Sequence, residues 1–189
     1  MAATPRTSGR ADAQRNRQRL IDVAHRAFTT GDGKVSLEAV AKEAGVGIGT
    51  LYRHFPTREA LVEAVYLAER GRLCDAADEL LTEQPPAQAL RTWMDRFADY
   101  IATKREMADA LRALIADGTV TRSPAREELS MAVRRLLDAG AAARTLRGDV
   151  QAEDVVAALV GVVSVCTLPE QQEQAGRLMD LLMDGLRRR

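Results

Sequence analysis

Three glycines at alternate positions are the residues of this chain that most directly suggest chemistry. Gly45, Gly47 and Gly49 lie in the stretch GVGIGTLYRHFPTR, residues 45–58. A glycine-rich loop can bring backbone N–H groups against the phosphates of a nucleotide, and small residues at the start of a helix can bring its backbone against the phosphates of DNA. The first use indicates a nucleotide-binding protein, and the second a DNA-binding protein.

The surroundings of the glycines argue against nucleotide binding. A dinucleotide-binding loop follows a strand, opens a helix and has the spacing G-x-G-x-x-G. Here the glycines follow SLEAVAKEA, residues 36–44, which is charged and helical in period, and their own spacing is G-x-G-x-G. The sequence GK[ST], whose lysine holds a phosphate in P-loops, is missing. The phosphates of DNA are therefore the better match.

Other reactive side chains are few. The chain has two histidines, His25 and His54, and two cysteines, Cys74 and Cys166, which are not in a CxxC arrangement. Neither pair has the spacing of a zinc site or of a disulfide framework. We therefore predict no catalytic residues, no metal site and no cofactor, so that the protein is not an enzyme. Both cysteines are expected to be small buried apolar residues.

Composition and charge fit a protein that binds a polyanion through one end. The 189 residues are 46% hydrophobic and 29% charged, with a net charge of zero. Residues 1–58 nevertheless hold ten Lys and Arg against five Asp and Glu. Such a basic segment suits an anionic macromolecule, because binding releases condensed counterions. A solvated charged surface is the alternative.

No segment indicates secretion or membrane insertion. The start, MAATPRTSGR, lacks the apolar core of a secretory signal. The uncharged run at 155–168, VVAALVGVVSVCTL, is shorter than the ~20 residues that cross a bilayer. We expect a cytoplasmic protein without a membrane partner.

The elements that position the glycines are helices. Apolar residues recur at helical spacing through most of the chain, and no stretch alternates in the manner of a half-buried strand. About nine helices are predicted, at 12–28, 37–44, 47–54, 58–84, 87–104, 105–116, 124–146, 151–168 and 170–187. The prediction is an all-α fold.

The second and third of these helices, with a turn at Gly45, predict a helix-turn-helix, in which the second helix enters the major groove of DNA. Three parts of the chain follow from this. They are a flexible basic N-terminal arm at 1–11, a helix-turn-helix DNA-binding domain at 12–56, and a helical domain at 57–189. Arg6 and Arg10 are either an arm that reaches the minor groove or a tail without a specific partner.

Residues 36–66, SLEAVAKEAGVGIGTLYRHFPTREALVEAVY, closely resemble the DNA-binding signature of the TetR/AcrR family of transcriptional regulators. The resemblance covers about the first 65 residues. It implies three N-terminal helices that bind DNA, and a C-terminal helical domain that binds a ligand and forms a homodimer.

Carried over by position, the resemblance assigns DNA contacts to eight residues. Ser36, Tyr52, His54 and Arg58 correspond to residues that contact the DNA backbone, and Gly49 and Thr50 to residues that contact bases or backbone. Gly47 and Ile48 stand where the family often has more polar residues, and Ile48 either contacts a thymine methyl group or packs.

The C-terminal part carries an aromatic stripe at helical spacing, which either is core or lines a cavity for a mostly apolar ligand. The residues predicted for a possible ligand pocket are Trp93, Met94, Phe97, Tyr100, Met107, Leu111 and Met131. The helices at 151–168 and 170–187 are predicted to form the homodimer interface.

The function predicted from these observations is that of a sequence-specific repressor. It would bind double-stranded DNA at a palindromic operator and leave it when a small, mostly apolar inducer binds. Two alternatives are a helical adaptor that has a helix-turn-helix shape but no specific operator, and a small helical enzyme.

Overall fold

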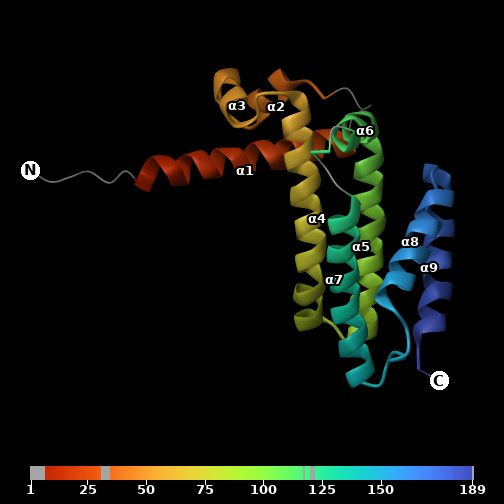
Figure 1. The fold of residues 1–189 in the computed structure, drawn as a ribbon. Coiled ribbons are helices and arrows are strands. Elements are labelled where there is room, and N and C mark those ends of the chain that lie inside the picture. The colour runs from red at the N-terminus through yellow and green to blue at the C-terminus, as the bar shows by residue number, and fades with distance from the viewer. Residues whose placement is uncertain (1–6, 31–34, 117, 120–121, 189) are drawn as a thin grey trace, which may run out of the picture. The chain divides into compact units, whose positions relative to one another are not determined.

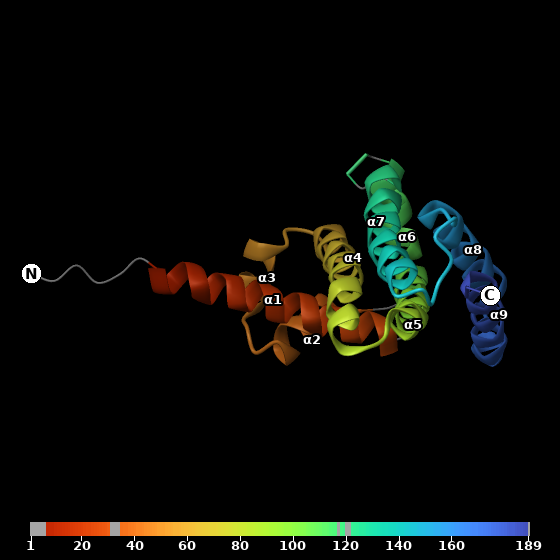
Figure 2. The ribbon, with the colours of Figure 1, turned by 90° about the horizontal axis from the view of Figure 1, so that it is seen from below.

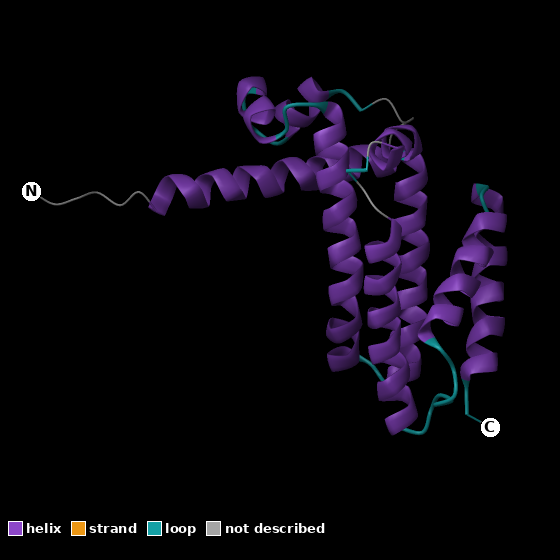
Figure 3. Cartoon of the chain, in the orientation of Figure 1, coloured by secondary structure: helices purple, strands orange, loops and turns teal. Residues whose placement is uncertain are grey.

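The computed structural model describes residues 7–30, 35–116, 118–119 and 122–188. Over these residues the chain forms nine α-helices and no strand, which confirms the predicted all-α fold (Figure 3). The helices are α1 (Thr7–Thr30), α2 (Leu37–Glu43), α3 (Ile48–His54), α4 (Arg58–Glu83), α5 (Pro86–Glu106), α6 (Ala108–Ala116), α7 (Arg122–Ala142), α8 (Ala152–Val165) and α9 (Gln172–Leu186), with a 3-10 turn at Pro169–Gln171 (Figure 1). None of the described helices is long and apolar enough to cross a membrane.

The helices pack into two compact units. The first contains Met1–Ala68 with Thr103–Val120, and the second contains Glu69–Ala102 with Thr121–Arg189. The long helices α4 and α5 therefore contribute to both. These units are defined by packing, whereas the predicted division after residue 56 is one of function and stays a prediction.

The core of the first unit forms around one side of α1. Leu20, Ile21, Ala24 and Phe28 recur at helical spacing and are at most 2% exposed. They pack with apolar side chains of α2, α3 and the start of α4. Those side chains are Val40, Ala41, Leu51, Leu61, Val62 and Val65, with Phe55 from the loop after α3. Burial of these side chains is what holds the two short helices α2 and α3, because helices of this length are not stable alone in water.

The core of the second unit is centred on α5. Trp93, Met94 and Phe97 are fully buried, and the rings of Trp93 and Phe97 stack with centroids 5.7 Å apart. The indole Nε1 of Trp93 donates a hydrogen bond of 2.8 Å to the carbonyl of Leu73 on α4. Helix α7 packs on α8, and α8 packs on α9.

Helix α1 begins earlier than the predicted start at Asp12. Residues 7–11 are helical, while residues 1–6, which include Arg6, lie outside the described part. The physical reason is local. Arg10, Ala11 and Ala13 favour helix, and Asp12 pairs with Arg15 three residues later inside the helix instead of capping it.

Two other helices end before their predicted limits. Helix α7 ends at Ala142 and not at residue 146, because Arg144 adopts a left-handed conformation with φ 57°. The chain then turns back, and the amides of Thr145 and Leu146 both donate to the carbonyl of Gly140. Helix α8 ends at Val165 and not at residue 168. The amides of Thr167 and Leu168 donate to the side-chain oxygen of Gln171, each at 3.0 Å.

Of the two cysteines expected to be buried, only Cys166 is fully so. Cys166 is buried and Cys74 is half-buried, and both are free thiols. Burial, assisted by the carboxylate of Glu128, raises the pKa of the Cys74 thiol to about 11. At neutral pH the Cys74 thiol is therefore protonated, which suits a packing role rather than nucleophilic chemistry.

Candidate nucleic-acid interface

A helix-turn-helix lies at residues 36–54 of the first unit. Helix α2 begins after Ser36, whose hydroxyl accepts the amide of Ala39 at 3.3 Å as an N-cap. The turn runs through Gly45, which has φ +66°, and the amide of Val46 donates to the carbonyl of Ala41 at 3.0 Å. Helix α3 then starts after Gly47, and both helices pack on α1 (Figure 1).

Two arginines of α1 attach it to the end of α2. The guanidinium of Arg19 donates to the carbonyl of Ala44, the last residue before the turn. Arg26 forms an ion pair of 3.0 Å with Glu43. Positive charge at the C-terminal end of a helix is also favourable for the helix dipole. Arg19 thus fixes the turn that aims α3.

Gly45 is required for two independent reasons, and substitution tests both. In Gly45→Ala the alanine would have to adopt φ +66°, and its Cβ would lie 3.0 Å from Nη2 of Arg19. We expect the free energy of unfolding of the protein to fall by about 2 kcal/mol. The matched control is Gly118→Ala, where φ is +81° but the new Cβ meets no atom within 4 Å.

Urea denaturation followed by circular dichroism measures both variants. Gly118→Ala should cost about 1 kcal/mol, the cost of the left-handed conformation alone. An equal decrease in the free energy of unfolding of the two variants would show that the contact with Arg19 adds no cost at residue 45.

Helix α3 has one buried and one exposed side. Leu51 is fully buried, whereas Ile48 is 39% and Tyr52 44% exposed. Gly47 and Gly49 are exposed, and Thr50 and His54 are half-buried. A Cβ added at Gly47 or Gly49 would meet no atom within 4 Å, so packing does not require glycine at either position. The predicted residues of α3 therefore lie together on or beside its exposed side.

The two remaining residues predicted to contact DNA flank the helix-turn-helix. Ser36 is exposed, and besides capping α2 its hydroxyl donates a hydrogen bond of 2.8 Å to Glu38, which lowers the pKa of that carboxyl. Arg58, at the start of α4, is half-buried, with its guanidinium 5.8 Å from the centre of the Phe28 ring. Arg58 is thus partly a packing residue.

Arg53 was not among the predicted residues. It is exposed in the last turn of α3, next to Tyr52. The sequence signal that identifies it is its distance from the buried Leu51, because a residue two positions after a buried one lies on the other side of a helix. With Arg53 the exposed side of α3 gains a cation.

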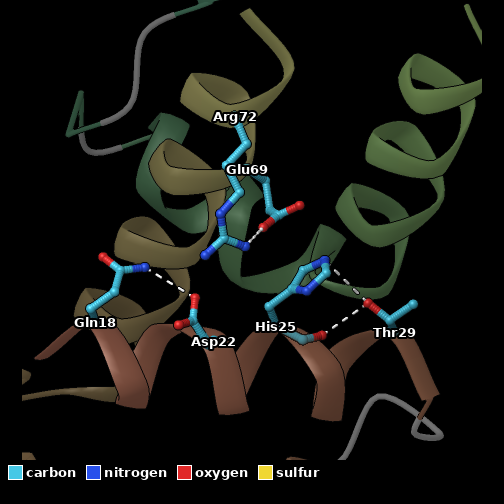
Figure 4. A network of polar contacts seen from close by, with 6 residues as sticks. All are labelled: Gln18, Asp22, His25, Thr29, Glu69 and Arg72. Carbon is cyan, nitrogen blue, oxygen red and sulfur yellow. Dashed lines mark hydrogen bonds and ion pairs between the residues drawn. The ribbon is translucent and has the colours of Figure 1, made fainter. Parts of the chain in front are cut away.

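Polar pairs also line α1 (Figure 4). The side-chain amide of Gln18 donates to Asp22 at 3.0 Å, and the hydroxyl of Thr29 donates to the carbonyl of His25 at 2.9 Å. On α4, Arg72 pairs with Glu69 at 2.6 Å. Each of these contacts joins two residues of the same helix and stabilises that helix by about 0.2–0.5 kcal/mol.

The residues predicted for the ligand pocket belong to both units, and their common role stays a prediction. Trp93, Met94, Phe97 and Tyr100 are buried in the second unit and fill its core, while Met107 and Leu111 are buried in the first unit. Met131 is 54% exposed on α7.

The second unit also has surface hollows. One of about 400 Å³ lies between the start of α5 and α9, with Arg91 and Asp180 at its rim. Another of about 410 Å³ runs along α7 to the start of α8, between Arg126 and Glu153. Of the residues predicted for the pocket, Met131 alone contributes to either of these two hollows, and it lines the second.

Two family models together match most of the chain. The model of the bacterial regulatory proteins of the tetR family matches residues 20–65, and the model of the SbtR-like transcriptional regulator C-terminal domain matches residues 85–188. A TetR transcriptional regulator from Streptomyces coelicolor is 48% identical, with a TM-score of 0.83, over 91% of this chain and 98% of that one. The chain belongs to the TetR family.

Two further relatives are also transcriptional regulators. A TetR regulatory protein from Mycobacterium vanbaalenii is 34% identical, with a TM-score of 0.73, over 94% of this chain and 98% of that one. An HTH-type transcriptional regulator of Staphylococcus aureus is 47% identical over 53 residues. That match spans 28% of this chain and 29% of the Staphylococcus protein.

The TetR assignment confirms the resemblance seen in residues 36–66. TetR-family proteins are transcription factors rather than enzymes. They bind DNA through the helix-turn-helix, and the family includes dimers that respond to small molecules. This chain is accordingly a transcriptional regulator with a DNA-binding helix-turn-helix.

Proposed function

We propose that the protein is a homodimeric repressor that binds a palindromic operator and is released by a small, mostly apolar inducer. The observation that carries the DNA-binding half of this proposal is the exposed side of α3. It presents Ile48, Tyr52 and Arg53 beside two glycines that the fold does not need. Small residues there allow the helix backbone to approach DNA closely.

The contacts in this proposal divide by side-chain chemistry. Ser36, Tyr52, His54 and Arg58 carry hydroxyl, imidazole and guanidinium groups that can donate to phosphate oxygens, as phosphate contacts require. Ile48 and Thr50 carry methyl groups that can contact the methyl group of thymine. Gly47 and Gly49 have no side chain, so the backbone at the start of α3 stays accessible to DNA.

Selection of bound fragments from genomic DNA tests the DNA-binding half. A repressor of this kind should enrich a palindrome, and salt titration on the best fragment should give a linear decrease of log affinity with log salt. Failure to enrich any palindrome would overturn the proposal and would favour a helical adaptor instead.

The proposed inducer site is the core around Trp93, Phe97 and Tyr100. These side chains supply apolar area, and Trp93 and Tyr100 add polar tips, which suits a mostly apolar ligand with a few polar groups. They also fill the space in which they lie, so the inducer would have to open this core. Binding is expected to change the fluorescence of Trp93, the only tryptophan of the chain.

The proposed dimer interface lies on α8 and α9. Val160 and Val165 of α8 and Leu181 of α9 are 44%, 68% and 66% exposed, which is unusual for large apolar side chains. Ala157, Ala158, Gly161 and Ser164, also on α8, are exposed, so a second helix can approach closely. We propose that a second copy of the chain covers these exposed side chains of α8 and α9.

Replacing Leu181 by Glu should dissociate this dimer. The unmodified chain should sediment as a dimer at micromolar concentration, and the variant as a monomer, with a dissociation constant raised at least about a hundredfold because a buried unpaired carboxylate is costly. Met131→Glu is the matched control, since Met131 is 54% exposed on α7, outside the proposed interface. Dissociation by both variants, or by neither, would contradict the assignment.

A further inference from the structure

In the exposed N-terminal half of α1, some side chains point to the same side of the helix as its buried side chains do farther along. Leu20, Ile21, Ala24 and Phe28 face the core, and Arg10 precedes Phe28 by five turns of 3.6 residues. Arg10 and Phe28 therefore point to the same side of the helix. Gln14 and Arg17 point within about 45° of that direction, because each residue turns the helix by about 100°.

A contact confirms the direction of this stripe of Arg10, Gln14 and Arg17. The guanidinium of Arg17 lies 5.1 Å from the centre of the Phe55 ring, and Phe55 is the C-cap residue that follows α3. The side of α1 that carries Arg10, Gln14 and Arg17 thus faces the side on which α3 lies. Stacking on Phe55 also holds Arg17 in place at little conformational cost.

The part of α1 that carries this stripe has little cover. Residues 10–15 and 17–19 are exposed, and the helix runs past α2 and α3 in both views (Figures 1 and 2). Its side chains from Arg10 to Arg19 include two alanines and no larger apolar residue. An exposed segment of this composition cannot dock through apolar contacts, and it carries four arginines against the single acid Asp12.

We propose that Arg10, Gln14 and Arg17 form a second DNA contact, on the backbone phosphates beside the groove that α3 enters. The contact rests on the proposed operator binding. Its chemistry is that of guanidinium and amide donors on phosphate oxygens, which are strong, charge-assisted hydrogen bonds. It adds affinity for any DNA sequence, because phosphates carry no sequence information.

The same helix supplies a matched control. Arg15 lies about 140° away from Arg10 around the helix and pairs with Asp12. Arg10→Ala and Arg15→Ala therefore remove the same charge from the same exposed helix, one inside the stripe and one outside it. Alanine favours helix, so neither substitution should unfold the segment.

The test is a salt titration of operator binding and of binding to an unrelated duplex. Arg10→Ala removes one phosphate contact per protomer, so the slope of log affinity against log salt should fall by about 2 for the dimer. Affinity for both duplexes should fall by roughly tenfold to a hundredfold at ~0.1 M salt. Arg15→Ala should change the slope by less than about half a unit.

The outcomes separate this proposal from the function on which it rests. Equal slopes for Arg10→Ala, Arg15→Ala and the unmodified chain, with operator binding intact, would overturn the second contact alone. A loss confined to the operator, with the unrelated duplex unaffected, would also overturn it, since it would make Arg10 a base contact. If the unmodified chain has no operator, the proposed function itself fails.

Discussion

Replacing Tyr52 and Arg53 together by alanine is expected to weaken operator binding at least about a hundredfold and to leave the fold intact. A dimer loses four contacts in this variant, and a loss of about 0.7 kcal/mol for each already amounts to about a hundredfold in affinity. Tyr52 is 44% exposed and Arg53 is exposed, so the melting temperature should change little. Fluorescence anisotropy with a labelled operator measures the affinity.

The control for this variant removes similar side chains elsewhere. Leu67, on α4, is 40% exposed, and Arg96, on α5, has 45% of its side chain exposed. The double variant Leu67→Ala, Arg96→Ala should bind the operator normally. Unchanged binding by the Tyr52, Arg53 variant would show that the exposed side of α3 does not face DNA.

Replacing Trp93 by alanine is expected to cause a large loss of stability. Trp93 is fully buried, stacks on Phe97 and donates to the carbonyl of Leu73. Removal of a buried indole costs about 3–5 kcal/mol, and the carbonyl of Leu73 loses its donor as well. Since domains are stable by ~5–15 kcal/mol, a large share of the stability should disappear. Urea denaturation followed by circular dichroism measures this loss of stability, because the variant has no tryptophan whose fluorescence could be followed.

Trp93→Phe separates the two contributions. It retains most of the apolar area and removes the donor, so it should cost about 1–3 kcal/mol. A loss below about 1 kcal/mol in Trp93→Ala would mean that the indole lines open space and not a packed core. That result would support the inducer cavity predicted from the aromatic stripe.

The sequence predicts the helix-turn-helix well because several local signals agree there. Ser36 caps α2, Gly45 has the positive φ that few other residues adopt, and Leu51 marks the buried side of α3. Each signal acts over a few residues, so none depends on a distant partner. The limits of α2 and α3 were accordingly predicted to within about one residue.

Other features depend on contacts that sequence spacing does not encode. Arg144 ends α7 in a left-handed conformation, for which arginine gives no signal. A stripe of Trp93, Phe97 and Tyr100 has the same spacing whether it packs or lines a cavity. The attachment of the turn by Arg19 joins residues 25 positions apart, and only folding brings them together.

The open space around Gly47 and Gly49 makes this helix a convenient starting point for protein engineering. Gly47 has φ −69° and ψ 148°, an ordinary backbone conformation for any L-residue, and it occupies the N-cap position, where Ser, Asp or Asn is preferred. Side chains introduced at 47 and 49 would project outward without disturbing the core. Libraries at these two positions can therefore search for new operator preferences while the rest of the scaffold stays constant.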